Sequence, residues 1–166
     1  MRKVKVKICG ITREEDLAVA VAAGADAVGF VVGVASSPRN LTLKKAEKLI
    51  RKVPIFVDSV AVTVTNNINS LTKIYEKLKP DALQIHSENL SKASVIREKI
   101  HDTPLIKALY MKTGNVIKDA IEASNSFDAI LLDSFVHGKY GGTGMVHDLE
   151  MSKQVKQTIE PKPLIL

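Results

Sequence analysis

The sequence has 166 residues, 45% of them hydrophobic and 25% charged, an ordinary globular composition with enough apolar material for a core. No apolar run approaches the roughly 20 residues that a membrane-spanning helix needs, and the first residues lack the apolar segment of a signal peptide, so we expect a cytoplasmic protein with no membrane partner. The net charge of +6 comes from scattered lysines, and three tyrosines and four phenylalanines offer few stacking platforms, so we expect no nucleic-acid partner.

Short runs rich in Val, Ile and Leu alternate with longer amphipathic stretches, at a period of roughly 25 residues that is typical of βα units. In chain order the pattern predicts strand Val4–Cys9, helix Arg13–Ala23, strand Ala27–Val32, helix Leu43–Val53, strand Ile55–Val60, helix Asn67–Leu78, strand Ala82–His86, helix Ser91–Ile100, strand Leu105–Tyr110, helix Val116–Ser124, strand Ala129–Asp133, helix Leu149–Thr158 and strand Pro163–Leu166. Helix starts are marked by Thr12, before a run of acidic residues, and by Thr42 and Ser91, just before apolar periodicity.

The predicted strands are near-continuous apolar runs, which indicates a parallel sheet covered on both faces. A doubly wound sheet would need a glycine-rich phosphate turn after its first strand, and Cys9-Gly10-Ile11-Thr12 does not match that pattern. We therefore predict the α/β class, with a parallel (β/α)8 fold of the TIM-barrel type present as about six βα units plus a seventh strand. Because no linker or low-complexity tract interrupts the chain, residues 1–166 are expected to form a single domain.

Two reactive side chains stand at the ends of predicted strands, where β/α barrels carry their chemistry. Side chains alternate along a strand, so Cys9 shares a face with Lys7 and should point into the barrel mouth, and Asp133 closes the sixth strand. Alternatively, Cys9 is a small buried hydrophobe and Asp133 caps the following turn. As the single cysteine, Cys9 cannot form an internal disulfide.

Six segments, in order and at plausible spacing, give the chain a specific family resemblance. They are Lys7-Ile8-Cys9-Gly10-Ile11-Thr12, Gly29-Phe30, Ser37-Pro38-Arg39, Gln84-Ile85-His86, Leu132-Asp133-Ser134 and Gly141-Gly142-Thr143-Gly144. Together they resemble phosphoribosylanthranilate isomerase over essentially the whole chain.

The resemblance implies an Amadori rearrangement in tryptophan biosynthesis, which converts N-(5-phosphoribosyl)anthranilate to 1-(2-carboxyphenylamino)-1-deoxyribulose 5-phosphate without cofactor or metal. It assigns Asp133 as the general acid that protonates the ribose ring oxygen and Cys9 as the base that removes a proton from the neighbouring sugar carbon. The expected partner is therefore a small phosphosugar-anthranilate substrate.

The same resemblance implies substrate-binding groups. Arg39 resembles the residue that meets the anthranilate carboxylate, and His86 would line the mouth, although Ser87 follows it where the family often has glycine. The segment Gly141, Gly142, Thr143 and Gly144 resembles a mobile loop that folds over the substrate. The alternatives are that Arg39 is an ordinary surface arginine and that the glycine segment is an ordinary flexible loop.

The chain also departs from the family pattern. Residues 32–36 are atypical, and His147-Asp148-Leu149 stands where the family commonly shows Phe-Asp-Trp. The seventh strand is the last predicted element, so we expect a barrel without its eighth strand and without the loops that hold phosphate in barrels of this class. Such a barrel leaves its first and seventh strands as open edges with uncovered apolar surface.

Two other functions stay open at this stage. One is a non-catalytic barrel fragment that pairs with another chain, or with itself as a homo-oligomer, through the open edge. The other is a Schiff-base aldolase on the same barrel, with Lys107 or Lys7 as the amine.

Overall fold

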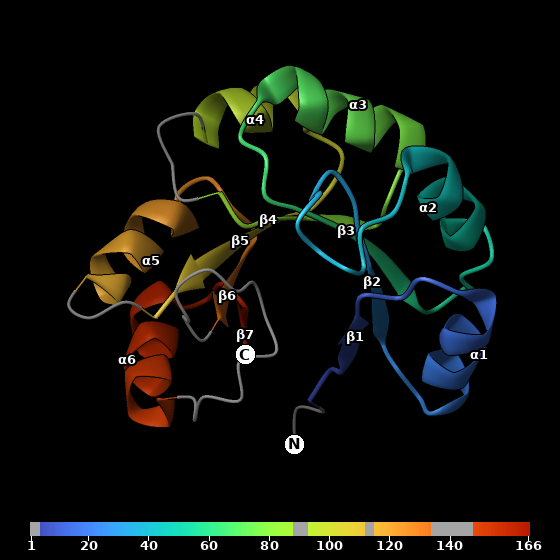
Figure 1. Cartoon of the computed structure of the whole chain (residues 1–166). Helices are drawn as coiled ribbons and strands as arrows, with labels where there is room; N and C mark the ends of the chain where they lie inside the picture. The colour runs from blue at the N-terminus through green and yellow to red at the C-terminus, as the bar shows by residue number, and fades with distance from the viewer. Residues whose placement is uncertain (1–3, 88–92, 112–114, 134–147) are drawn as a thin grey trace.

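A computed structural model describes residues 4–87, 93–111, 115–133 and 148–166, and its main feature is a curled, seven-stranded parallel sheet. The strands are β1 (Lys7–Cys9), β2 (Ala27–Val31), β3 (Asp58–Thr63), β4 (Ala82–Ile85), β5 (Leu105–Tyr110), β6 (Ala129–Asp133) and β7 (Leu164–Ile165). The helices are α1 (Glu14–Ala22), α2 (Leu43–Ile50), α3 (Ile68–Leu78), α4 (Ala93–Lys99), α5 (Val116–Ser124) and α6 (Leu149–Ile159). Each strand pairs with the next one along the chain, and the helices form an arc outside the sheet (Figure 1). The α/β barrel-type prediction is confirmed.

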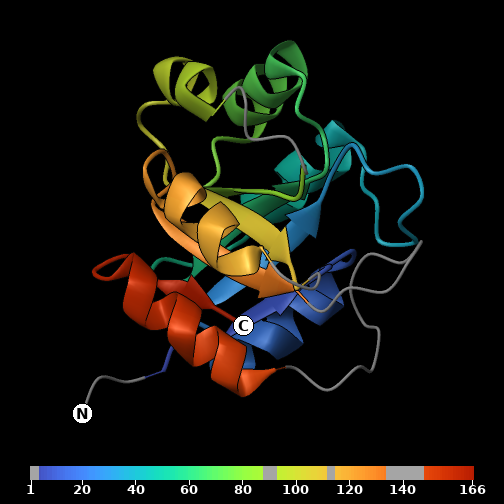
Figure 2. The same ribbon diagram turned by 90° about the vertical axis from the view of Figure 1, so that its left-hand side faces the viewer.

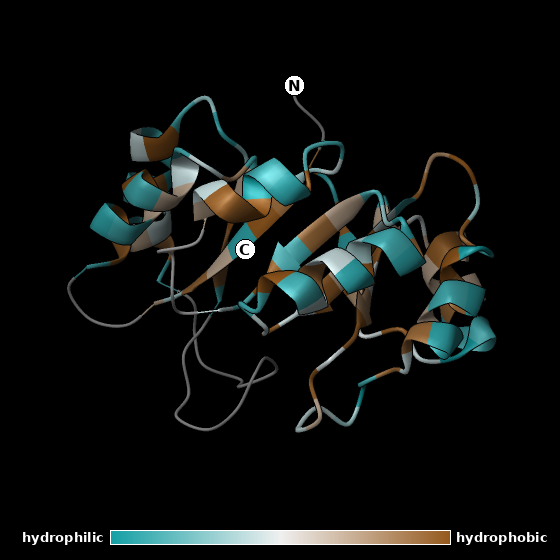
Figure 3. Ribbon diagram, turned by 90° about the horizontal axis from the view of Figure 1, so that it is seen from above, coloured by the Kyte–Doolittle hydropathy of each residue, from teal (hydrophilic) through white to brown (hydrophobic). Residues whose placement is uncertain are grey.

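Apolar side chains pack on both faces of the sheet, as the unbroken apolar runs predicted. The larger cluster lies between sheet and helices and contains Phe30, Leu83, Leu105, Leu109 and Ile130. A smaller cluster fills the concave side and contains Val60, Val62, Ile106 and Ala129. Viewed from above, hydrophobic and hydrophilic residues alternate along the helices (Figure 3), and buried helix residues such as Leu49 and Leu71 belong to the larger cluster.

The predicted bounds of β5, β6 and α5 agree with the structure, whereas the prediction for the third strand is wrong. Residues 55–57 lie before β3, which begins at Asp58 and runs to Thr63. Ile55 is 82% exposed, and Phe56 is 95% exposed with a positive φ of 71°, which no strand residue adopts. The prediction relied on apolar character alone and began the strand three residues too early. Ile55 and Phe56 are apolar, but they are exposed to solvent and are not part of the strand.

Among the helix starts that the structure describes, three have a side chain that accepts a hydrogen bond from the first turn. Thr42 accepts from the Lys45 amide at 3.2 Å, as predicted, and Asn67 and Asp148 cap α3 and α6 in the same way. The prediction for Thr12 is wrong, since the residue before α1 is Arg13, which makes no side-chain cap. Ser91 lies outside the described residues.

An aspartate stands directly before each of β2, β4 and β6, and its carboxylate accepts a hydrogen bond from a backbone amide at the start of the preceding strand; we call this contact a brace. Asp26 accepts from the Val6 amide at 2.9 Å, and Asp128 accepts from the Leu105 amide at 2.7 Å. Asp81 accepts from both the amide and the hydroxyl of Ser59, each at 2.7 Å. The same hydrogen bond therefore recurs in the pairs β1/β2, β3/β4 and β5/β6, where it fixes the register of the two strands at their amino ends.

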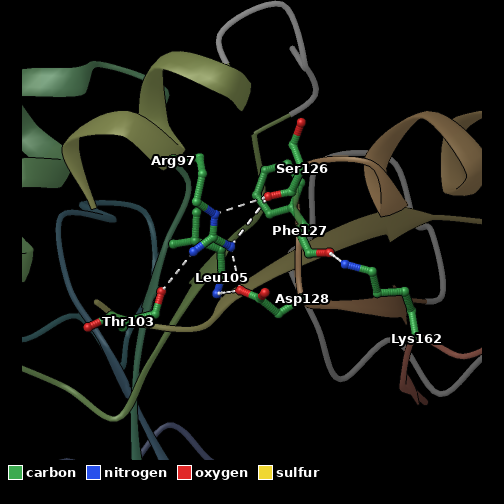
Figure 4. A network of polar contacts seen from close by, with 7 residues as sticks. All are labelled: Arg97, Thr103, Leu105, Ser126, Phe127, Asp128 and Lys162. Carbon is green, nitrogen blue, oxygen red and sulfur yellow. Dashed lines mark hydrogen bonds and ion pairs between the residues drawn. The ribbon is translucent and has the colours of Figure 1, made fainter. Parts of the chain in front are cut away.

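At the third of these positions the brace extends into a network (Figure 4). Arg97 of α4 pairs with Asp128 and donates to the carbonyl oxygens of Ser126 and Thr103 at 3.3 Å. Lys162 donates to the Phe127 carbonyl at 2.9 Å. Burial opposes ionisation of Asp128, but the Leu105 amide and the Arg97 guanidinium outweigh it and lower the pKa of this carboxyl. The network joins α4, β5, β6 and the segment before β7.

The two ends of the sheet, β1 and β7, turn toward each other as the sheet curls, and within the described residues no strand joins them (Figures 1 and 2). Val4, Val6 and Ile8 are 81%, 48% and 42% exposed, so apolar surface is exposed along the first edge, as expected there. None of the helices in the described ranges is long and apolar enough to cross a membrane.

We predict that Asp81→Ala lowers the free energy of unfolding by about 1–3 kcal/mol, because it leaves two donors of buried Ser59 without an acceptor. Urea unfolding followed by circular dichroism measures the change. The exposed Glu122→Ala in α5 is the matched control and should stay within about 0.5 kcal/mol. Equal midpoints for the two variants would show that the brace contributes nothing.

Candidate active site

The sequence-predicted residues gather at the carboxyl ends of the strands. Cys9 is the last residue of β1, Asp133 is the last residue of β6, and His86 directly follows β4. Arg39 lies between β2 and α2. Because parallel strands end on the same side of the sheet, these side chains share one end of the molecule. Gly141, Gly142, Thr143 and Gly144 lie outside the described residues.

Cys9 is an exposed thiol at this end, so the structure contradicts its reading as a small buried hydrophobe. In the β1–β2 register Cys9 lies opposite Gly29. A Cβ atom added to Gly29 would lie 2.7 Å from Sγ of Cys9, which is too close for any side chain. The glycine therefore leaves space for the sulfur on the concave face.

Arg39 lies over the turn that follows Cys9. Gly10 has a φ of +88°, and a Cβ atom there would overlap the Cδ atom of the Arg39 side chain. The loop that carries Arg39 is held by its own hydrogen bonds, since Asn40 Oδ1 accepts from the Val34 amide at 2.9 Å. A glycine with left-handed backbone thus brings a guanidinium next to the strand that ends in the thiol.

A chain of polar contacts crosses the concave side beneath the thiol. Lys7 Nζ donates to Gln84 Oε1, although β1 and β4 are three places apart in the sheet. Gln84 Nε2 lies 2.5 Å from His86 Nε2, and His86 Nδ1 lies 3.4 Å from the Tyr110 hydroxyl. The two rings are tilted at 49° with centroids 6.1 Å apart. A contact between β1 and β4 is possible only because the sheet curls.

The acid predicted at the sixth strand belongs to the same face. Asp133 is half-buried and pairs in register with Tyr110 of β5. It therefore lies next to Tyr110, the last residue in the chain of polar contacts that starts at Lys7. Lys7 feels the charges of both Cys9 and Asp133. Thiol, carboxyl and ammonium therefore form one electrostatic unit.

Burial is the main cause of the pKa shifts of two side chains on this face, Lys7 and His86. It lowers the pKa of Lys7, and the charges of Cys9 and Asp133 counteract that effect. For His86, burial is again the main cause, with additional repulsion from Lys7 and Lys107, and the pKa falls to about 4. His86 is therefore a neutral imidazole at neutral pH.

Lys107 lies on the other face of the sheet. It points to the same side of β5 as Leu105 and Leu109, and it is 2% exposed. Its amine donates to the backbone carbonyl oxygen of Ser87, and to that of Ala108 at 2.9 Å. A carbonyl substrate at the mouth cannot reach this amine, so the aldolase reading through Lys107 is wrong.

Gln84, Tyr110 and the role of Lys7 in this cluster were missed in the sequence. Lys7 and Gln84 each stand two residues before a predicted site residue, Cys9 and His86, and so share its face. Alternation placed Lys7 beside Cys9 and could have placed Gln84 beside His86 in the same way. Tyr110 depends on the β5–β6 register, which the sequence does not reveal. In the described part of the chain no cluster of three or more His, Cys, Asp or Glu side chains could hold a metal ion.

Comparison with known proteins gives a consistent family. Residues 6–166 match the family model described as N-(5'-phosphoribosyl)anthranilate (PRA) isomerase. The N-(5'-phosphoribosyl)anthranilate isomerase of Methanosarcina acetivorans is 41% identical over 179 residues, covering 99% of this chain and 74% of that protein. The protein of the same name from Pseudomonas fluorescens is 41% identical over 166 residues, covering 100% of this chain and 77% of that protein.

Solved structures agree with this result. The phosphoribosyl anthranilate isomerase of Thermotoga maritima is 26% identical, with a TM-score of 0.76 over 98% of this chain and 87% of that one. A phosphoribosyl anthranilate isomerase in complex with reduced 1-(o-carboxyphenylamino)-1-deoxyribulose 5-phosphate is also 26% identical, with a TM-score of 0.72 over 99% of this chain and 87% of that one.

We predict that the His86 imidazole stays neutral as the pH falls from 7 to about 5, because its folded pKa of about 4 lies below the ordinary value of about 6.5. NMR titration of its ring proton, assigned by the signal lost in His86→Gln, measures this. The depressed pKa implies a stability contribution that is fully present above about pH 6.5 and falls as the pH drops toward 4. A folded-state midpoint equal to that of the urea-unfolded chain would contradict the buried, neutral assignment.

Proposed function

The chain belongs to the N-(5'-phosphoribosyl)anthranilate isomerase family, enzymes of tryptophan biosynthesis, and we propose that Cys9, Asp133 and Arg39 carry its Amadori rearrangement. The substrate is N-(5-phosphoribosyl)anthranilate and the product is 1-(2-carboxyphenylamino)-1-deoxyribulose 5-phosphate. The observation that carries the assignment is the placement of a thiol and a carboxyl at the carboxyl ends of β1 and β6, which lie at the same end of the parallel sheet.

Ring opening is the first step and needs an acid. The protonated Asp133 carboxyl donates its proton to the ribose ring oxygen while the carbon–oxygen bond breaks, and the anilino nitrogen lone pair forms the carbon–nitrogen double bond. Asp133 is half-buried at a strand end, where a substrate in the mouth can reach it. The step leaves an iminium ion and a carboxylate.

Proton abstraction is the second step and needs a base. The iminium makes the proton on the neighbouring sugar carbon acidic, and the Cys9 thiolate removes it to give an enolamine, which tautomerises to the ketone. Gly29 leaves room for the sulfur, and Cys9 is exposed at the mouth, where a substrate can reach it. The thiol and the carboxyl thereby exchange protonation states over the two steps.

Substrate orientation falls to Arg39. Its guanidinium lies over the turn after Cys9, and a planar, bidentate donor suits the anthranilate carboxylate. His86, neutral and half-buried, would line the mouth on the β4 side without acting as a base. The reduced product analogue bound by a relative that is 26% identical supports a substrate of this class.

We predict that Cys9→Ala and Asp133→Asn each lower kcat by about 10²–10⁴-fold, because each removes a proton-transfer group. Arg39→Ala should instead raise KM by roughly 10- to 100-fold, because the lost charge-assisted hydrogen bonds are made to ground state and transition state alike. The fluorescence decay of freshly generated substrate measures all three.

Arg51→Ala is the matched control, since Arg51 is exposed and pairs with Glu47 at the end of α2, away from the mouth. Its kinetic constants should equal those of the unaltered protein. Turnover that survives both Cys9→Ala and Asp133→Asn would refute the residue assignment. Binding of the reduced product analogue without turnover by the unaltered protein would favour the non-catalytic alternative.

A further inference from the structure

Lys7 is a charged group on the concave face that the proposed mechanism does not use. It stands two residues before Cys9 on the same face of β1, one step deeper in the sheet than the thiol. Its hydrogen-bond partner is the neutral amide of Gln84, rather than a carboxylate that would cancel its charge. The positive charge therefore acts on the groups around it. These include Cys9, two residues further along β1, and Asp133, which pairs in register with Tyr110 at the far end of the polar chain.

The polar chain fixes the position of this ammonium. Because Gln84 Oε1 accepts from Lys7, the Gln84 amide nitrogen is the group that faces His86, and it must donate to Nε2. The neutral ring then carries its proton on Nδ1, which faces the Tyr110 oxygen. A chain with a single polarity thus runs from β1 across β4 to β5 and holds Lys7 in place.

The proposed reaction makes a fixed cation useful. Before ring opening Cys9 is a thiolate and Asp133 is protonated, and after proton abstraction Cys9 is a thiol and Asp133 a carboxylate. The pair carries one net negative charge at both points, although the charge moves from sulfur to oxygen. A cation that interacts with both groups compensates it at both points without having to move.

We propose that Lys7 is a positioning residue that acts through Cys9 and Asp133 as their shared countercharge, held by Gln84, His86 and Tyr110. This inference rests on the proposed function, because it requires that the thiol and the carboxyl exchange protonation states. One part of it is independent of the reaction: the ammonium should favour the reactive, anionic form of Cys9 in the protein without substrate.

Other titratable groups also face this region. They are Arg39 over the turn after Cys9, His86 next to β4, Tyr110 of β5 and Asp133 of β6, and Lys107 of β5 acts on His86 by its charge. Lys5 pairs with Asp26 at 3.0 Å and its side chain is 78% exposed, so solvent screens its charge. It therefore offers a matched comparison, with the same charge two residues before Lys7 at a solvated position.

The test measures the pH dependence of Cys9 alkylation by iodoacetamide in the protein without substrate. Since Cys9 is the single cysteine, mass spectrometry reports one reactive site. In Lys7→Met the pH of half-maximal rate should rise by about one unit, the size of a charge interaction at several ångströms in a partly buried site. Lys5→Met should leave the pH of half-maximal rate within about 0.2 units of that of the unaltered protein. Lys7→Arg keeps the charge, so its value should lie between those of Lys7→Met and Lys5→Met.

Kinetics of the isomerase reaction supply the second readout. Lys7→Met should lower kcat by roughly 10- to 100-fold with KM nearly unchanged, because the countercharge matters most during proton transfer. Thermal unfolding of each variant checks that the fold persists. If Lys7→Met does not fold, Gln84→Leu releases the ammonium while keeping its charge and should shift the alkylation profile in the same direction by a smaller amount.

The two proposals fail in different ways. An alkylation profile that is the same in Lys7→Met and in the unaltered protein would overturn the countercharge even if the isomerase is fully active. A shifted profile in a protein without isomerase activity would retain the charge coupling and refute the proposed function. Equal shifts for Lys5→Met and Lys7→Met would mean that net charge, and not the position of Lys7, controls the thiol.

Discussion

The parallel alignment of β1 to β7 is the constraint on which this molecule depends. Because every strand runs in the same direction and the sheet curls, side chains that end distant strands meet at one end. Lys7 of β1 can touch Gln84 of β4 only for this reason. Cys9 and Asp133, 124 positions apart in the sequence, act on the same ammonium for the same reason.

Stability and chemistry occupy opposite ends of the strands. At the amino ends Asp26, Asp81 and Asp128 accept backbone amides from the preceding strands, and Arg97 ties the last of them to α4. At the carboxyl ends the polar groups include an exposed thiol and a half-buried carboxyl. Because the two sets of groups lie at opposite ends, the mouth can hold reactive side chains while the aspartate hydrogen bonds keep the strands in register.

The sequence predicted the fold class, the strands that end in Cys9 and Asp133 and the strand that His86 follows, because apolar runs and alternation are local signals. It failed at residues 55–57, where solvent-exposed Ile55 and Phe56 imitate a strand. Caps were found only in part: Thr42 was recognised, whereas Asn67 and Asp148 were not. The chain from Lys7 to Tyr110 joins three strands across the concave face, and local patterns do not encode such contacts.

A crystal structure of the Cys9→Ala variant with reduced 1-(o-carboxyphenylamino)-1-deoxyribulose 5-phosphate would test most directly whether these strand ends form one active site. The account predicts the reduced sugar carbons between position 9 and Asp133, with the aromatic carboxylate on the Arg39 guanidinium. An analogue bound at another place on the molecule, or with its carboxylate turned away from Arg39, would contradict it.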